Sequence, residues 1–217
     1  MKHFLIRLLN MLIGLVLFAV GIVTTVKANI GFPPWDVFHA GLSETLGLTF
    51  GITSIIVGMI ILVIIVLLGE KIGLGTIVNI VVIGIFIDII FFVDLLPTPE
   101  NLLLGILMLI LGLFLVSIGS YFYIGSGFGT GPRDGLMVVL TKRTKLPVGV
   151  CRSAVELLVT AAGWLLGGMV GIGTLISVIG IGLCIQITFR VLRFDITKIK
   201  HESLWDTFNV LTKKNQT

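Results

Sequence analysis

The chain has 217 residues, a formal net charge of +4 and a mean hydropathy of +1.17, with 56% apolar and only 12% charged residues. A soluble domain carries about 25% charged residues, and a chain of this length could not hide so much apolar surface from water. The composition therefore excludes a soluble globular domain and predicts an all-α integral membrane protein.

Six apolar runs are long enough to cross a bilayer, because a spanning helix needs about 20 mostly apolar residues. They cover residues 5–26, 52–69, 74–93, 101–124, 149–169 and 172–192. The first run follows a basic start, as in a signal peptide, but it lacks a clear cleavage site and is expected to be retained. We expect a single transmembrane domain over 1–193 and a short cytoplasmic tail over 194–217.

Positive charge gathers on one side of the predicted spans. With six spans both termini share a side, and that side holds Arg7, Arg133 and the basic segment 142–145, whereas the opposite connections hold Lys27 and the acidic, proline-rich segment 94–101. Because cytoplasmic loops are enriched in Lys and Arg, we expect both termini in the cytoplasm. The basic residues form no stripe with aromatic residues, so nucleic acid is not an expected partner.

The two halves of the chain are related by a shift of 98 residues. Between 21–88 and 119–186, 17 of 68 positions are identical, and 10 of these identities are Gly, Pro, Asp or Thr. Each half, about 5–93 and about 101–192, contains three spans, so the second half would enter the bilayer from the opposite side. The sequence therefore predicts two inverted-topology three-helix repeats, a construction common among secondary transporters.

The pattern G-x-x-P-x-D occurs at equivalent places in the two long connections. The turn residues of this pattern are Gly31, Pro34, Gly129 and Pro132. Proline suits the first position of a helix, and the helix dipole favours Asp36 and Asp134 in the first turn. We expect a short helix to follow each turn, about 34–46 and 132–143, neither of them long enough to span.

These two short helices are candidates for half-helices that line a polar cavity. Their free N-terminal N–H groups favour an anionic or carboxylate-bearing ligand. The substrate-binding side chains of this hypothesis are Asn29, Asp36, Ser126, Thr130, Arg133 and Asp134. The alternative is ordinary helix capping at the membrane surface, in which each aspartate only complements a helix dipole.

Ionisable residues inside a span are costly and are therefore functional candidates. Arg152 and Glu156 are spaced i, i+4 on one helix face, and Asp88 is the equivalent of Gln186. Glu156 or Asp88 would bind a proton or cation coupled to a substrate. Alternatively, Arg152 and Glu156 form a self-neutralised structural pair and Asp88 reaches the membrane interface. His39 is expected to be a surface residue.

No pattern for a cofactor, a metal ion or covalent catalysis is found in the sequence. Cys151 and Cys184 lie in apolar runs and are interpreted as buried structural thiols. The P-loop pattern G-x-x-x-x-G-K-[ST] does not occur, and no Ser/His/Asp set is recognised. We therefore expect neither a cofactor nor an enzymatic activity.

The Gly-rich stretches around both connections resemble the bacterial YczE/YyaS/YitT family of multispan membrane proteins. The most specific element is G-x-G-P-R-D-G at 129–135, followed by the R-x-x-x-E of Arg152 and Glu156. The likeness covers about 3–193 and is closest to the YczE-type branch, without the soluble C-terminal domain that YitT-type members usually carry. The resemblance implies a protein of the bacterial plasma membrane and names no substrate.

Two functional hypotheses follow. The first is a small secondary transporter that works by alternating access around a midplane site, with Arg133 and Ser126 on an anionic group and Glu156 or Asp88 as coupling carboxylate. The second is a non-transporting scaffold or accessory factor for a membrane enzyme or export system, with the basic segment 142–145 and the tail as its interaction surface. Expected partners are the lipid bilayer, a small-molecule substrate, and a second copy or another membrane protein.

Overall fold

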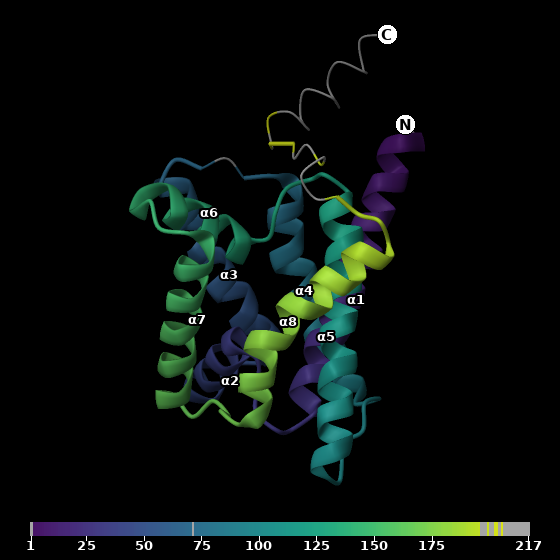
Figure 1. Cartoon of the computed structure of the whole chain (residues 1–217), viewed down its shortest axis with the longest axis vertical. Helices are drawn as coiled ribbons and strands as arrows, with labels where there is room; N and C mark the ends of the chain where they lie inside the picture. Colours follow the sequence, from purple (N-terminus) through teal and green to yellow (C-terminus); the bar gives the residue numbers. More distant parts are fainter. Residues whose placement is uncertain (1, 71, 196–198, 200–201, 204, 206–217) are drawn as a thin grey trace.

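The computed structural model describes residues 2–70, 72–195, 199, 202, 203 and 205. This part of the chain forms eight α-helices (Figure 1). They are α1 (Lys2–Lys27), α2 (Pro34–Leu46), α3 (Phe50–Leu67), α4 (Leu74–Val93), α5 (Leu102–Gly125), α6 (Pro132–Thr144), α7 (Val148–Leu165) and α8 (Ile172–Val191). The predicted tail, 194–217, lies mostly outside the described residues.

Six of the described helices, all except α2 and α6, are long and apolar enough to cross a membrane by length and composition. Their bounds fall close to the predicted runs, and the all-α membrane class is confirmed. The match is good because the length of an apolar run is a local property that tertiary packing barely alters.

The two short helices begin where the repeated pattern predicts. Pro34 opens α2 and Pro132 opens α6, and Asp36 and Asp134 lie in the first turns. Proline has no N–H to leave unsatisfied at this position, so the helix can start there at no cost in hydrogen bonding. Figure 1 shows α6 toward the end of the molecule where α1 begins, and α2 toward the opposite end.

Helices α1 and α5 pack together through glycines. A Cβ on Gly21 would stand 2.7 Å from the backbone nitrogen of Val116, and a Cβ on Gly119 would stand 2.7 Å from the backbone nitrogen of Phe18, the equivalent of Val116. Small residues allow this close approach of membrane helices. Gly21 and Gly119 occupy equivalent positions of the two halves. The contacts between α1 and α5 are therefore related by the 98-residue shift.

Further helix contacts follow the same shift. Helix α2 packs on α7 as α6 packs on α3, and α4 packs on α1 as α8 packs on α5. The Gly173 N–H donates to the Ile30 carbonyl over 2.7 Å, and the Gly75 N–H donates to the Phe128 carbonyl over 2.8 Å. These two hydrogen bonds join equivalent positions and attach each long connection to the other half of the molecule.

Gly31 is required at the first of these junctions. Its φ is 108°, and a Cβ would lie 2.5 Å from the backbone nitrogen of Gly171. A side chain would therefore be strained in conformation and would also clash with the opposite turn. Gly129, with a φ of 124°, is packed against Gly73 in the equivalent way.

One pair of contacts breaks the equivalence. A Cβ on Gly51 of α3 would stand 2.0 Å from the carbonyl oxygen of Gly84 in α4, so these helices touch at the backbone. The equivalent glycines, Gly149 of α7 and Gly182 of α8, have no atom within 4 Å of such a Cβ. Figure 1 shows α7 standing apart from α8. The separation of these two helices leaves room for a cavity.

Candidate functional site: a cavity between the two short helices

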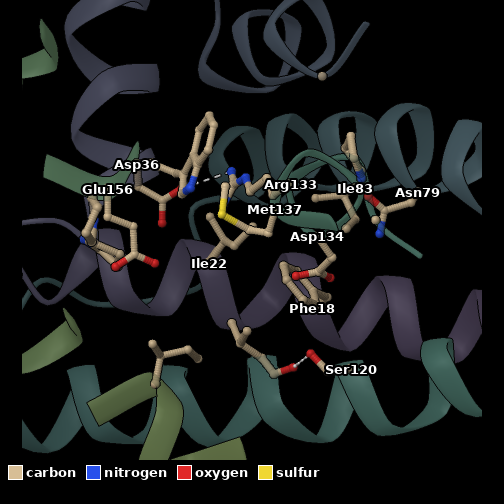
Figure 2. A pocket seen from close by; sticks show the side chains of 18 of the residues that line it. Phe18, Ile22, Asp36, Asn79, Ile83, Ser120, Arg133, Asp134, Met137 and Glu156 are labelled. Carbon is tan, nitrogen blue, oxygen red and sulfur yellow. Dashed lines mark hydrogen bonds and ion pairs between the residues drawn. The ribbon is translucent and has the colours of Figure 1, made fainter. Parts of the chain in front are cut away.

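A cavity of about 490 Å³ lies between the two halves (Figure 2). Its wall includes the first turns of both short helices, with Pro34 and Asp36 from α2 and Pro132 and Asp134 from α6. Residues of α1, α3, α4, α5, α7 and α8 complete it. This volume lies within the range of about 300–1,000 Å³ that is typical of small-molecule sites, and the repeated pattern lines it from both sides.

Arg133 is the central cation of the cavity. Its guanidinium carbon lies 5.0 Å from the centre of the Trp35 ring, within the distance of a cation–π contact. One guanidinium nitrogen lies 3.8 Å from Asp36 Oδ1 and 3.4 Å from His39 Nδ1. Because Asp36 is only 3% exposed, its charge needs a partner, and Arg133 from the other half of the chain provides it.

A second ion pair lines the cavity on α7. Arg152 Nε donates to Glu156 Oε1 over 2.8 Å, and both residues belong to the cavity wall. The i, i+4 spacing places the two side chains on one face of the helix, where they reach each other without bending the backbone. The pair therefore faces the cavity as well as neutralising itself.

Asp134 lines the cavity with no ion-pair partner within 4 Å among the described residues. A Cβ on Gly131 would stand 3.7 Å from Asp134 Oδ2, 3.7 Å from the Tyr123 hydroxyl and 3.9 Å from Asn79 Nδ2. The Tyr123 side chain is 2% exposed, and its hydroxyl has no hydrogen-bond partner within the described structure. These three polar groups surround one point beside the start of α6.

Of the other residues predicted to bind substrate, Thr130 lines the cavity, and its carbonyl accepts a hydrogen bond from Thr76 Oγ1 over 2.7 Å. Ser126 lies outside it: its hydroxyl donates to the Tyr123 carbonyl, and its own carbonyl accepts from Arg7 Nε over 2.7 Å. Asn29 is exposed at the turn after α1, with a φ of 54°. These two residues shape the connections.

Asp88 and Gln186 also lie outside the cavity wall. Asp88 accepts hydrogen bonds from the Thr49 hydroxyl over 2.5 Å and from the Gly51 N–H over 2.7 Å, at the beginning of α3. Its carboxylate therefore satisfies backbone and side-chain donors at a helix N-terminus. Gln186 is exposed on α8.

The expectation that His39 is a surface residue is wrong. The side chain is 2% exposed, and its ring lies 3.7 Å from Asp36 and edge-on to the Phe50 ring. The i, i+3 spacing from Asp36, which places both on one helix face, is the signal that indicates this position. Tyr123 and Asn79 are further cavity residues that the sequence hypothesis did not include.

Comparison with known proteins finds the family described as "Family of unknown function (DUF6198)", which matches residues 5–190. The uncharacterized membrane protein YczE of Bacillus subtilis is 37% identical over 175 residues, or 80% of each chain. An uncharacterized protein of Haemophilus influenzae is 32% identical over 83% of this chain and 84% of its own length, and the uncharacterized protein YyaS of B. subtilis is 31% identical over 76% and 84%. No solved structure matches.

Proposed function

This chain belongs to the YczE/YyaS family of membrane proteins, matched by DUF6198, and we propose that it is a small secondary transporter of the bacterial plasma membrane. The observation that carries the proposal is that one cavity, within the described part of the chain, has both copies of the P-x-D turn in its wall. In transporters built from inverted repeats, substrate sites lie where such broken or shortened helices meet.

The proposed mechanism is alternating access between two inverted repeats. The contact between Gly51 and Gly84, together with the open positions of Gly149 and Gly182, supports it. In the counterpart conformation, α7 would close on α8 while α3 separates from α4. In such an exchange, the close packing seen between α3 and α4 would form between α7 and α8 instead. The cavity would then open toward the opposite membrane face.

Glu156 and Asp134 are the proposed carboxylates of substrate binding and ion coupling, because both line the cavity. The N-termini of α2 and α6 adjoin the same space, so a carboxylate-bearing solute remains one substrate class to test. Both termini are proposed to be cytoplasmic from the distribution of Lys and Arg.

Proteoliposome currents test the transport function. Purified protein is reconstituted and exposed to concentration jumps of small amines, carboxylates, amino acids and phosphate, with and without a proton gradient. We expect at least one solute to give a current that Asp134→Asn or Glu156→Gln abolishes. Glu100→Gln, an exposed position outside the cavity wall, is the control and should keep the wild-type current. If the wild-type protein gave no current with any of these classes of solute, the result would contradict transport.

The alternative, a scaffold or accessory factor for a membrane enzyme or export system, uses the basic segment 142–145 and the tail as its surface. Lys142 pairs with Glu70 over 2.6 Å and Arg143 donates to the Leu68 carbonyl over 3.2 Å, so these two side chains attach α6 to the connection after α3. We therefore rank this function second. Truncation after Arg193 distinguishes the two, because partner capture would be lost with the tail whereas transport would survive.

A further inference from the structure

The charged side chains of the cavity wall do not balance. Among the described residues the wall has three carboxylates and two guanidinium groups, Asp36, Asp134, Glu156, Arg133 and Arg152. Arg133 pairs with Asp36, and Arg152 pairs with Glu156. Each cation thus already faces a carboxylate, and Asp134 is the carboxylate that remains.

An ion pair between the two halves explains why Asp134 lacks a close cation. Asp36 and Asp134 are equivalent, but the residue before each differs, with Trp35 in α2 and Arg133 in α6. Arg133 turns across the cavity to the Trp35 ring and to Asp36. Among the described residues, only one of the two equivalent carboxylates therefore has an ion-pair partner within 4 Å, and Arg152 and Arg133 attract Asp134 over a longer distance.

A carboxylate in a largely apolar cavity is costly unless a proton or a cation compensates it. Asp134 stands beside the Tyr123 hydroxyl, which can accept a hydrogen bond, around the point where a Cβ on Gly131 would lie. The Asn79 amide places its donor nitrogen Nδ2 3.9 Å from the same point. An ammonium group has three donors and one positive charge. Its requirements match the Asp134 carboxylate and the Tyr123 hydroxyl, whereas a carboxylate ligand would meet repulsion from Asp134.

The remaining wall is suited to an apolar body. Phe18, Ile83 and Val116 line the same cavity, and Figure 2 shows Asp134 and Asn79 on one side of it and Asp36 and Glu156 on the other. A ligand held at Asp134 by its polar end would therefore place an alkyl or aromatic part against apolar side chains.

We propose that the cavity binds a protonated amine with an apolar body, and that Asp134 and Tyr123 hold its ammonium group. The inference rests on the proposed function in taking this cavity as the substrate site, and it names the chemical class of the substrate. Arg133 then neutralises Asp36 instead of binding an anionic ligand.

Matched four-carbon probes test the proposal. n-Butylamine, butyrate and n-butanol share an alkyl chain and differ in charge, and binding to the detergent-solubilised protein is followed by isothermal calorimetry and by the unfolding temperature. We expect butylamine to bind and to raise the unfolding temperature, whereas butyrate and butanol at the same concentration leave it unchanged. Binding that is stronger for butyrate than for butylamine would overturn the proposal.

Two variants locate the binding. Asp134→Asn keeps the shape and removes the charge, and should weaken butylamine binding about tenfold or more. Gly131→Ala adds a methyl group at the centre of the three polar atoms; its φ of −61° and its nearest neighbours at 3.7 Å allow the protein to fold. Gly125→Ala, whose Cβ would meet only the Phe194 ring at 3.4 Å outside the cavity wall, is the matched control and should bind as wild type.

The outcomes separate this inference from the transport proposal. Butylamine binding that both site variants abolish, without any amine-driven current in proteoliposomes, would support the site and contradict transport. Equal butylamine binding in wild type, Asp134→Asn and Gly131→Ala would overturn the site, and a current with another class of solute would then leave transport standing.

Discussion

The guanidinium of Arg133 lies over the ring of Trp35, and these two residues occupy equivalent positions, 98 residues apart, in the two halves of the chain. This contact joins the two halves at the wall of the cavity, and the buried carboxylate of Asp36 lies beside it. The burial of Asp36 thus depends on a charge contributed by the other half.

Replacing Arg133 by Met should destabilise the protein, because Asp36 would keep its charge without a cation. Breaking a buried pair costs about 3–5 kcal/mol; since the Arg133 side chain is 32% exposed, we expect a smaller loss, about 2 kcal/mol. Chemical or thermal unfolding in detergent measures it. Adding Asp36→Asn should recover most of the loss, and a double variant as unstable as Arg133→Met alone would contradict the pairing.

The exposed pair of Lys142 and Glu70 provides the comparison for this measurement. Lys142→Met removes an ion pair of short distance, 2.6 Å, whose lysine side chain is 62% exposed. Surface ion pairs contribute about 0–1 kcal/mol, so we expect little change in unfolding. A loss equal to that of Arg133→Met would show that burial does not explain the contribution of the Arg133–Asp36 pair to stability.

Asp88 is predicted to stabilise the start of α3 without taking part in coupling. Asp88→Ala removes the acceptor of the Thr49 hydroxyl and of the Gly51 N–H, and hydrogen bonds to a charged group contribute about 1.5–3 kcal/mol each. We expect a lower unfolding temperature but an unchanged proton dependence of any current. Gln186→Ala, at the equivalent exposed position, should change neither, and an altered proton dependence in Asp88→Ala would restore this residue as a coupling candidate.

Equivalent glycines should respond differently to the same substitution. Gly51→Ala would place a methyl 2.0 Å from the Gly84 carbonyl, whereas Gly149→Ala meets nothing within 4 Å. Overpacking costs about 1–3 kcal/mol, and alanine in an open helix position is favourable by up to about 1 kcal/mol. Unfolding temperatures should therefore fall for Gly51→Ala and stay level or rise for Gly149→Ala. Equal responses would mean that α7 and α8 are as close as α3 and α4.

The membrane class, the spans and the short helices could be predicted because each depends on local pattern. Pro34 and Pro132 fix the starts of α2 and α6 whatever surrounds them. The repeat also predicts Asp36 and Asp134 as site residues, since the same charged residue occurs at equivalent positions of two largely apolar halves.

The partnerships inside the cavity could not be predicted in the same way. The ion pair of Arg133 with Asp36 joins residues 97 positions apart, and no rule of sequence spacing predicts which aspartate pairs with this arginine. Ser126 lies in the segment that the sequence singled out, but the last turn of α5 directs its hydroxyl to the Tyr123 carbonyl. Proximity in sequence to a cavity residue did not decide which side chains reach the cavity.

Gly182 gives the sharpest test of alternating access. Gly182→Leu fills open space on α8 outside the cavity wall, so the protein should fold and should bind butylamine as wild type does. In the proposed counterpart conformation, however, α7 must approach this point as closely as α3 approaches Gly84, and a leucine side chain would keep them apart. We therefore expect the current to fall about tenfold or more while binding is retained, as when a closing motion limits turnover. Leu183→Ile, at the next exposed position of the same helix, should transport normally. A wild-type current in Gly182→Leu would show that α7 does not close on α8 during transport.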